Sequence, residues 1–135
     1  MNKKLLALTL VFAFVLAACG GGSGPKTTID VTFAEFTFTP SAFTIPAGQE
    51  ITINTTNNGA VLHEFVIMKL GETVGEDFGD EDEGNIYWEV ETEAGQKTTT
   101  TFTAPTEPGE YQLVCGTEGH YVAGMIGTLT VVADK

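Results

Sequence analysis

Four side chains of this sequence have the types and the spacing of a metal-ligand set. Cys115, His120 and Met125 stand in a Cys-x4-His-x4-Met arrangement, and His63 lies well upstream of them. Two imidazole nitrogens and one thiolate in a trigonal plane, with a weak axial thioether, form a blue-copper electron-transfer site. Sulfur ligands suit Cu(I), and imidazole also serves copper in its oxidised state. The sequence therefore predicts one copper ion per chain, bound by these four residues.

Each of these residues also has an ordinary structural interpretation. A buried cysteine is usually an inert small hydrophobe, and a single histidine is more often structural than ligating. However, the chain has only two histidines and two cysteines, and both histidines and Cys115 fall on ligand positions. Met68 is the internal methionine that follows His63 along the same predicted strand, so we expect it to fill the core. The joint occurrence of the four residues favours copper binding.

Strands and one glycine-rich loop would position the ligands. Cys115 ends a predicted strand, and Met125 immediately precedes another, so the three C-terminal ligands share one interstrand loop. Three glycines give that loop backbone freedom. His63 would come from a neighbouring apolar strand at the same end of the fold.

From residue 27 onward the sequence is typical of strands separated by turns. Apolar and polar residues alternate with a period of two, which indicates half-buried strands. The predicted strands span residues 29–33, 36–45 with an interruption at Pro40, 51–55, 61–68, 97–103, 111–115 and 126–132. Strands at this spacing predict an all-β fold, an antiparallel β-sandwich of about 100 residues.

An acidic, glycine-rich segment over residues 71–86 interrupts the strand pattern. Its acidic residues are Glu72, Glu76, Asp77, Asp80, Glu81, Asp82 and Glu83. We interpret it first as a solvated loop that resists aggregation, and second as a docking patch for a partner. A calcium site is not favoured, because the spacing does not match a loop of alternating oxygen ligands.

The N-terminus has the pattern of an export signal. A basic opening precedes an uncharged apolar run over residues 5–18, which is shorter than the roughly 20 residues that span a bilayer but suits a secretory signal. The run ends in Leu-Ala-Ala-Cys at residues 16–19. This ending resembles the lipobox of bacterial lipoproteins, and the resemblance implies cleavage and acylation of Cys19. An ordinary signal peptide with a coincidental cysteine is the alternative.

We therefore expect a lipoprotein signal peptide at residues 1–18, a flexible lipid-anchored tether at 19–26 and one domain at 27–135. A chain of 135 residues has room for one domain of ordinary size. With Cys19 acylated, Cys115 would be a solitary thiol in an oxidising compartment, where disulfides are the usual state of cysteine. Such a thiol requires a role, and metal ligation is one.

Charge limits the partners of the exported chain. Cleavage after residue 18 would leave four lysines, no arginine and 18 acidic residues, a net charge of −14. Nucleic-acid phosphates would be repelled, and the lipid on Cys19 would have to provide the attachment to the membrane. We expect an extracytoplasmic, membrane-anchored monomer, facing the periplasm or the cell surface, with a basic redox partner.

Residues 27–135 resemble the cupredoxins, the family of plastocyanin, azurin and auracyanin. The Cys-x4-His-x4-Met interval is similar to that of the auracyanin and rusticyanin type. The lead-in Phe-Thr-Ala-Pro and Pro-Gly-Glu-Tyr within residues 102–111 is similar as well. The resemblance implies a Greek-key sandwich, two histidines and one cysteine as strong copper ligands, Met125 as the axial ligand, and one-electron transfer without substrate chemistry.

The chain departs from the family pattern at Glu64. Many cupredoxins have Asn after the first ligand His, and the Asn side chain ties the two ligand loops together. A carboxylate would accept hydrogen bonds in that role, and such partners tune a metal site. Alternatively, it would reach the metal, as in the red-copper relatives that have a Glu ligand.

The ligand set leaves two functions open. The leading hypothesis is a membrane-tethered one-electron carrier that serves a basic partner, such as a c-type cytochrome or an oxidase. In this hypothesis the electron leaves through His120, beneath an apolar rim over residues 121–124. The alternative is a copper-binding protein for copper tolerance or delivery, which Met- or His-rich tracts would favour. An enzyme is not expected, because catalytic copper sites need further histidines and a CuA centre needs two bridging cysteines.

Overall fold

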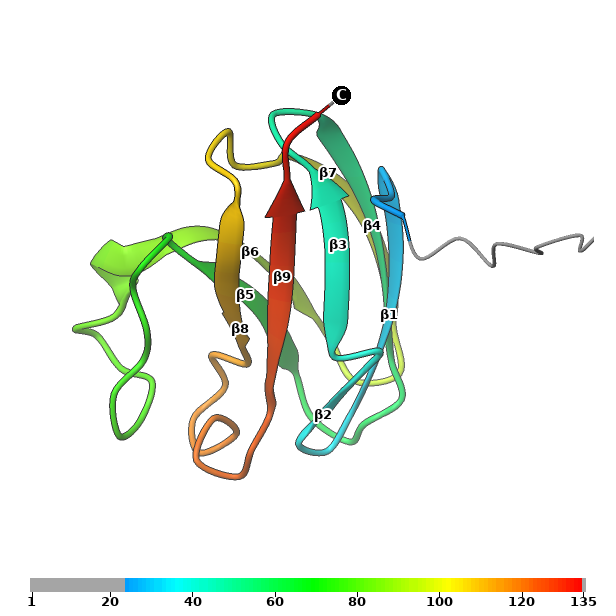
Figure 1. Ribbon diagram of the computed structural model, residues 1–135. Coiled ribbons are helices and arrows are strands. Elements are labelled where there is room, and N and C mark those ends of the chain that lie inside the picture. Colours follow the sequence, from blue (N-terminus) through cyan, green and yellow to red (C-terminus); the bar gives the residue numbers. More distant parts are fainter. Residues whose placement is uncertain (1–23, 135) are drawn as a thin grey trace, which may run out of the picture.

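The computed structural model describes residues 24–134, which form two packed β-sheets (Figure 1). The strands are β1 (Thr28–Ala34), β2 (Thr37–Thr39), β3 (Ala42–Pro46), β4 (Glu50–Asn57), β5 (His63–Met68), β6 (Ile86–Thr92), β7 (Lys97–Thr103), β8 (Gly109–Val114) and β9 (Ile126–Val132). One sheet has the order β2-β1-β4-β7 and the other β3-β9-β8-β5-β6. A single 3-10 turn, η1 (Glu83–Asn85), is the only helical element in this range. The predicted all-β sandwich is confirmed.

The predicted signal peptide, Cys19 and most of the predicted tether lie outside the described residues. Among the residues that are described, no helix has the length and apolarity needed to cross a membrane.

Most strands agree with their sequence predictions, and one strand was missed. The predictions over residues 97–103 and 126–132 match β7 and β9 residue for residue, and Pro40 separates β2 from β3 as expected. The missed strand is β6, an edge strand directly after the acidic segment. Its residues alternate between half-buried and exposed positions. This period-two signal was present in the sequence, but the last residue of the acidic segment overlaps its start.

The sheets are mixed, which corrects the prediction of a purely antiparallel sandwich. The β1–β4 and β3–β9 pairs are parallel, and the other pairs are antiparallel. Between β1 and β4 the chain passes through β2 in one sheet and β3 in the other, so β4 returns to β1 in the same direction. Residue alternation indicates which face of a strand is buried, but not the direction of its neighbour.

Phe65 on β5 lies at the centre of an aromatic cluster in the core. Its ring centroid is 6.4 Å from that of Phe33, 5.5 Å from that of Phe38 and 5.8 Å from that of Phe43. These rings come from four strands in both sheets. Aromatic pairs at such distances contribute about 0.5–1.5 kcal/mol beyond the area that they bury. Phe65 therefore joins the two layers directly behind His63.

β5 is buried on both faces because the acidic segment folds back over it. Inner side chains of β5 join the main core, whereas Val66 and Met68 on the outer face form a second cluster with Val74 and Val114. Met68 therefore fills a core, as the sequence predicted. The segment exposes most of its carboxylates while Val74 anchors it to the sheet.

The loop between β8 and β9 and the turn between β1 and β2 lie at the same end of the sandwich. Figure 1 shows them together at the lower end, in orange and cyan, opposite the C-terminus. β5 starts at this end with His63. The predicted ligands are therefore brought to one edge of the fold.

Replacing Phe65 by alanine should lower the free energy of unfolding of the copper-free domain by about 3–5 kcal/mol, since it removes a fully buried ring. Urea unfolding curves measure this loss. Val122→Ala is the control, because Val122 is 64% exposed and its truncation should change the free energy by less than about 0.5 kcal/mol. Equal losses in the two variants would contradict the assigned core.

Candidate metal centre

Three buried side chains direct a nitrogen or a sulfur toward one common point. His63, Cys115 and His120 form the one cluster of three or more potential ligands that the described residues contain, with their ligand atoms within 4.8 Å of one another. Cys115 Sγ lies 3.8 Å from His63 Nδ1 and 3.5 Å from His120 Nδ1. The two Nδ1 atoms are 3.1 Å apart.

The two sulfur–nitrogen separations fit a single metal ion of the first transition row, and the nitrogen–nitrogen separation is somewhat shorter than the ideal value. Metal–nitrogen bonds of about 2.0 Å and metal–sulfur bonds of about 2.3 Å place trigonal ligands roughly 3.5–3.8 Å from one another. Two imidazole lone pairs facing each other at 3.1 Å repel unless a proton or a cation lies between them. One thiolate with two imidazoles is the equatorial donor set of a blue-copper centre.

The backbone places Met125 beside two of the three clustered ligands. Met125 donates its N–H to the carbonyl of His120, and Cys115 donates its N–H to the carbonyl of Met125, both at 3.0 Å. Met125 is fully buried in the same core cluster as Cys115. These two hydrogen bonds set the position of the Met125 backbone. Axial ligation by the Met125 sulfur stays a prediction.

The two ligand-bearing segments are tied together by backbone and hydroxyl donors. The N–H of Glu64 donates to Cys115 Sγ at 3.4 Å. Thr117 donates its hydroxyl to the carbonyl of Leu62 at 3.1 Å. Thr117 thus makes the connection that the resemblance assigns to an Asn side chain.

The Glu64 carboxylate does not belong to the cluster of potential ligands. It lies over Gly116, where an added Cβ would clash with Glu64 Oε2. Burial raises the pKa of Glu64, and Glu91, Glu89 and Glu83 raise this pKa further. Only glycine at position 116 leaves room for this carboxylate beside the ligand loop.

His63 is held in the form that binds a metal. Burial lowers the pKa of His63, the nearby His120 lowers it further, and Glu35 acts in the opposite direction. A lowered pKa favours the neutral imidazole, whose lone pair is the ligand. In the described part of the chain, Nε2 of His63 is buried and has no hydrogen-bond partner.

His120 lies just below the surface, at 7% exposure. Val122 is 64% exposed, in line with the expected apolar rim, but Tyr121 is half-buried and donates its hydroxyl to the carbonyls of Val74 and Gly75. Phe36 contacts the His120 ring edge-on, with centroids 5.3 Å apart and planes at 90°. The sequence predicted that Phe36 lies in a strand, but it lies in the turn before β2, and its place beside His120 depends on how β1 and β2 pack.

Known proteins of one family match this chain. Residues 6–131 match the cupredoxin-like domain family. Auracyanin-A of Chloroflexus aurantiacus is 34% identical, over 90% of this chain and 91% of its own length. Auracyanin-B of the same organism is 29% identical, over 91% of this chain and 62% of its own length. The dithionite-reduced auracyanin of the photosynthetic bacterium Roseiflexus castenholzii superposes with a TM-score of 0.68 at 34% identity, over 81% of this chain and 99% of the other.

The chain is a member of the cupredoxin-like family. Family membership, the trigonal arrangement of nitrogen and sulfur atoms and the soft donor set together identify its cofactor as copper, in a type 1 site. A site of this kind transfers single electrons.

Copper added to the domain should give an intense visible band at one copper per chain, because the Cys115 thiolate transfers charge to Cu(II). Cys115→Ser should abolish this band, since a hydroxyl does not replace the thiolate. Absorption spectra during copper titration measure both. A Cys115→Ser protein that keeps the band would overturn the assignment of this ligand.

Met125→Leu should keep copper bound and raise the reduction potential. Removing a weak thioether donor destabilises Cu(II) more than Cu(I). Potentiometric titration followed in the visible band measures the shift, and Met68→Leu is the matched control because Met68 lies in the other buried cluster. Complete loss of copper from Met125→Leu would mean that Met125 is a principal ligand rather than an axial one.

Proposed function

We propose that this protein is an extracytoplasmic electron carrier, anchored to a membrane through Cys19, that exchanges one electron at a time with a basic redox protein. The observation that carries the proposal is the burial of the ligand cluster, in which only His120 among the three clustered ligands reaches the surface of the described residues. His63 and Cys115 have no exposed surface, whereas His120 reaches the surface below Phe36 and near Val122. Copper supplies the change between Cu(I) and Cu(II).

Burial of the ligands favours electron transfer over copper delivery. Handing copper to another protein requires incoming ligands to replace Cys115 and His63, and both side chains are enclosed by the core. An electron needs no such access. The Glu64 N–H donates to the Cys115 sulfur, and the Thr117 hydroxyl connects the two ligand-bearing segments. Both bonds limit the movement of the ligands when the charge of the site changes.

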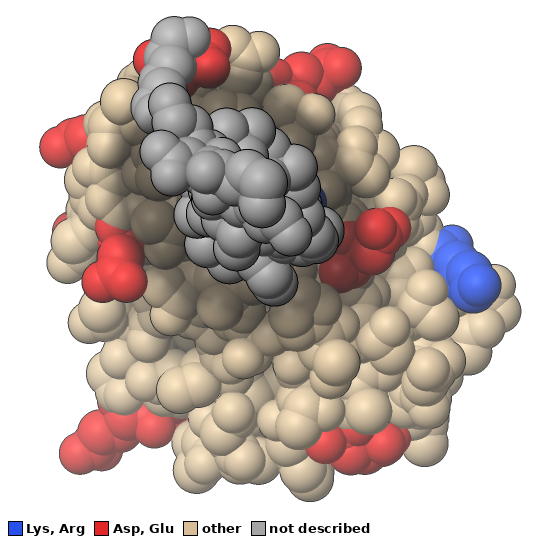
Figure 2. Space-filling view, turned by 45° about the vertical axis from the view of Figure 1, so that its right-hand side comes forward, with Lys and Arg blue, Asp and Glu red and all other residues tan. Residues whose placement is uncertain are grey.

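The surface charge favours a basic partner. The described part of the chain carries many more acidic than basic side chains, and Figure 2 shows acidic residues at many places on one face. A field of one sign raises the rate of encounter with an oppositely charged protein by about 10- to 1000-fold at low salt. At physiological ionic strength the Debye length is about 8 Å, so distant charges then contribute little.

Contact and steering should respond differently to salt. Val122→Asp should slow electron transfer to a basic cytochrome at every ionic strength, because it places a charge at the point of contact. Replacing Asp80, Glu81 and Glu83 by their amides should slow transfer only at low salt. Asp82 is kept, because it is buried and its carboxylate accepts the Gly79 N–H.

Stopped-flow kinetics across a salt series measure both effects. The copper band and the reduction potential of each variant serve as controls for an intact site. Rates that stay flat or rise with salt in the unmodified protein would rule out steering, and the acidic segment would then be a solubilising surface only.

Anchoring is tested separately from electron transfer. Cys19→Ser in the full-length chain should move the protein from the membrane fraction to the soluble exported fraction, because it removes the proposed site of acylation. Fractionation with detection of the domain measures the distribution. Retention of the Cys19→Ser protein in the membrane fraction would refute the lipid anchor while leaving the copper site untouched.

A further inference from the structure

The turn between β1 and β2 lies beside both histidines of the copper site, with Phe36 in contact with His120 and Glu35 near His63. It consists of Glu35 and Phe36, and Phe36 is the one non-glycine residue with positive φ, 64°, in the described part of the chain. Bulky residues rarely adopt this conformation. Strained residues of this kind gather at functional sites, where surrounding contacts keep them in place.

Glu35 faces the buried edge of His63. Its Oε1 accepts the Ala60 N–H at 2.5 Å, which fixes the carboxylate over the 57–60 turn. An added Cβ at Gly59 would lie 2.9 Å from Glu35 Oε1 and 2.6 Å from His63 Nε2, so both atoms lie beside this glycine. The Nε2 edge has no hydrogen-bond partner among residues 24–134. A metal-ligating histidine usually presents its second nitrogen to a carboxylate, a carbonyl or water.

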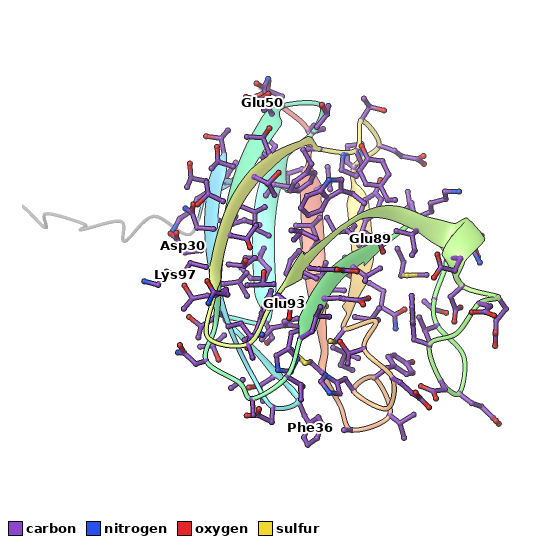
Figure 3. All side chains as sticks on the ribbon, turned by 180° about the vertical axis from the view of Figure 1, so that it is seen from behind. Asp30, Phe36, Glu50, Glu89, Glu93 and Lys97 are labelled. Carbon is purple, nitrogen blue, oxygen red and sulfur yellow. The ribbon has the colours of Figure 1, made fainter. Side chains whose placement is uncertain are left out.

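Phe36 covers the other histidine. Its ring stands edge-on to His120 at 5.3 Å, and it is 44% exposed while His120 is only 7% exposed. The phenyl ring therefore lies between the imidazole and the solvent at the lower end of the molecule in Figure 3. The turn with this positive φ places Glu35 near one histidine and Phe36 against the other.

We propose that the Glu35-Phe36 turn is a clamp that positions both histidine ligands and sets the reduction potential, with Glu35 as the electrostatic partner of His63 and Phe36 as the cover of His120. The clamp requires copper in the site, but it requires neither the membrane anchor nor a particular redox partner.

The two residues should shift the potential in opposite directions. With one thiolate ligand, the copper site carries one more positive charge in the oxidised state than in the reduced state. The Glu35 carboxylate favours the oxidised state by Coulomb attraction and lowers the potential. The Phe36 ring keeps water away from His120, which disfavours the more highly charged state and raises the potential.

Glu35→Gln should shift the equilibrium toward Cu(I) by roughly threefold to tenfold, where tenfold corresponds to about 59 mV for one electron. The amide oxygen can still accept the Ala60 N–H, so the turn should persist. Glu50→Gln is the matched control, because it removes the same charge at the opposite end of the sandwich (Figure 3). Its potential should stay close to that of the unmodified protein.

Phe36→Asn should shift the equilibrium toward Cu(II) by at least roughly twofold, because it removes the cover. Asparagine tolerates the positive φ, so the turn conformation is kept. Phe36→Tyr retains the ring, so its reduction potential should stay close to that of the unmodified protein. Potentiometric titration of all four variants measures the direction of both shifts in reduction potential in one series.

Proton NMR of the diamagnetic Cu(I) protein provides a readout for each histidine. Glu35→Gln should shift the Nε2–H signal of His63 and leave the ring signals of His120 in place. Phe36→Asn should shift the His120 ring signals, which lose the ring current of the phenyl group, and leave those of His63. The clamp would be overturned if Glu35→Gln and Phe36→Asn shifted the reduction potential in the same direction. It would also be overturned if Glu35→Gln and Glu50→Gln shifted the potential equally, or if the histidine signals stayed unchanged.

Discussion

The structure depends on holding two imidazole nitrogens and one thiol sulfur within 3.1–3.8 Å of one another, in side chains that are at least nine-tenths buried. Polar groups that are buried in this way are costly unless they are bound to something. The protein meets this constraint by placing one ligand on a strand and two on a loop, with the core directly behind them. A single copper ion satisfies all three atoms at once.

Aromatic packing and hydrogen bonds between distant segments hold the ligands in position. The aromatic cluster around Phe65 joins the sheets behind His63, and Thr117 and the Glu64 N–H connect the two ligand segments. Backbone hydrogen bonds connect Met125 to His120 and Cys115 within the β8–β9 loop. These contacts involve protein groups only, and they hold the ligand segments in place from several sides.

The acidic segment and the β1–β2 turn pack around the metal site from different sides. The segment buries Val74 against the outer face of β5, and Tyr121 ties it to the ligand loop. Glu35 and Phe36 approach the histidines from the opposite sheet. The ligand loop is therefore in contact with the acidic segment through Tyr121 and with the β1–β2 turn through His120.

The sequence by itself determined the donor types and all of the strands except β6, because a period of two and a Cys-x4-His-x4-Met spacing are local patterns. It placed Met68 in the core and Pro40 between two strands. Only the tertiary structure decided the parallel pairs β1–β4 and β3–β9, the docking of the acidic segment, the Thr117 tie and the position of Phe36 over His120. These features join residues far apart in the chain, and their geometry depends on how the two sheets pack, which no local pattern encodes.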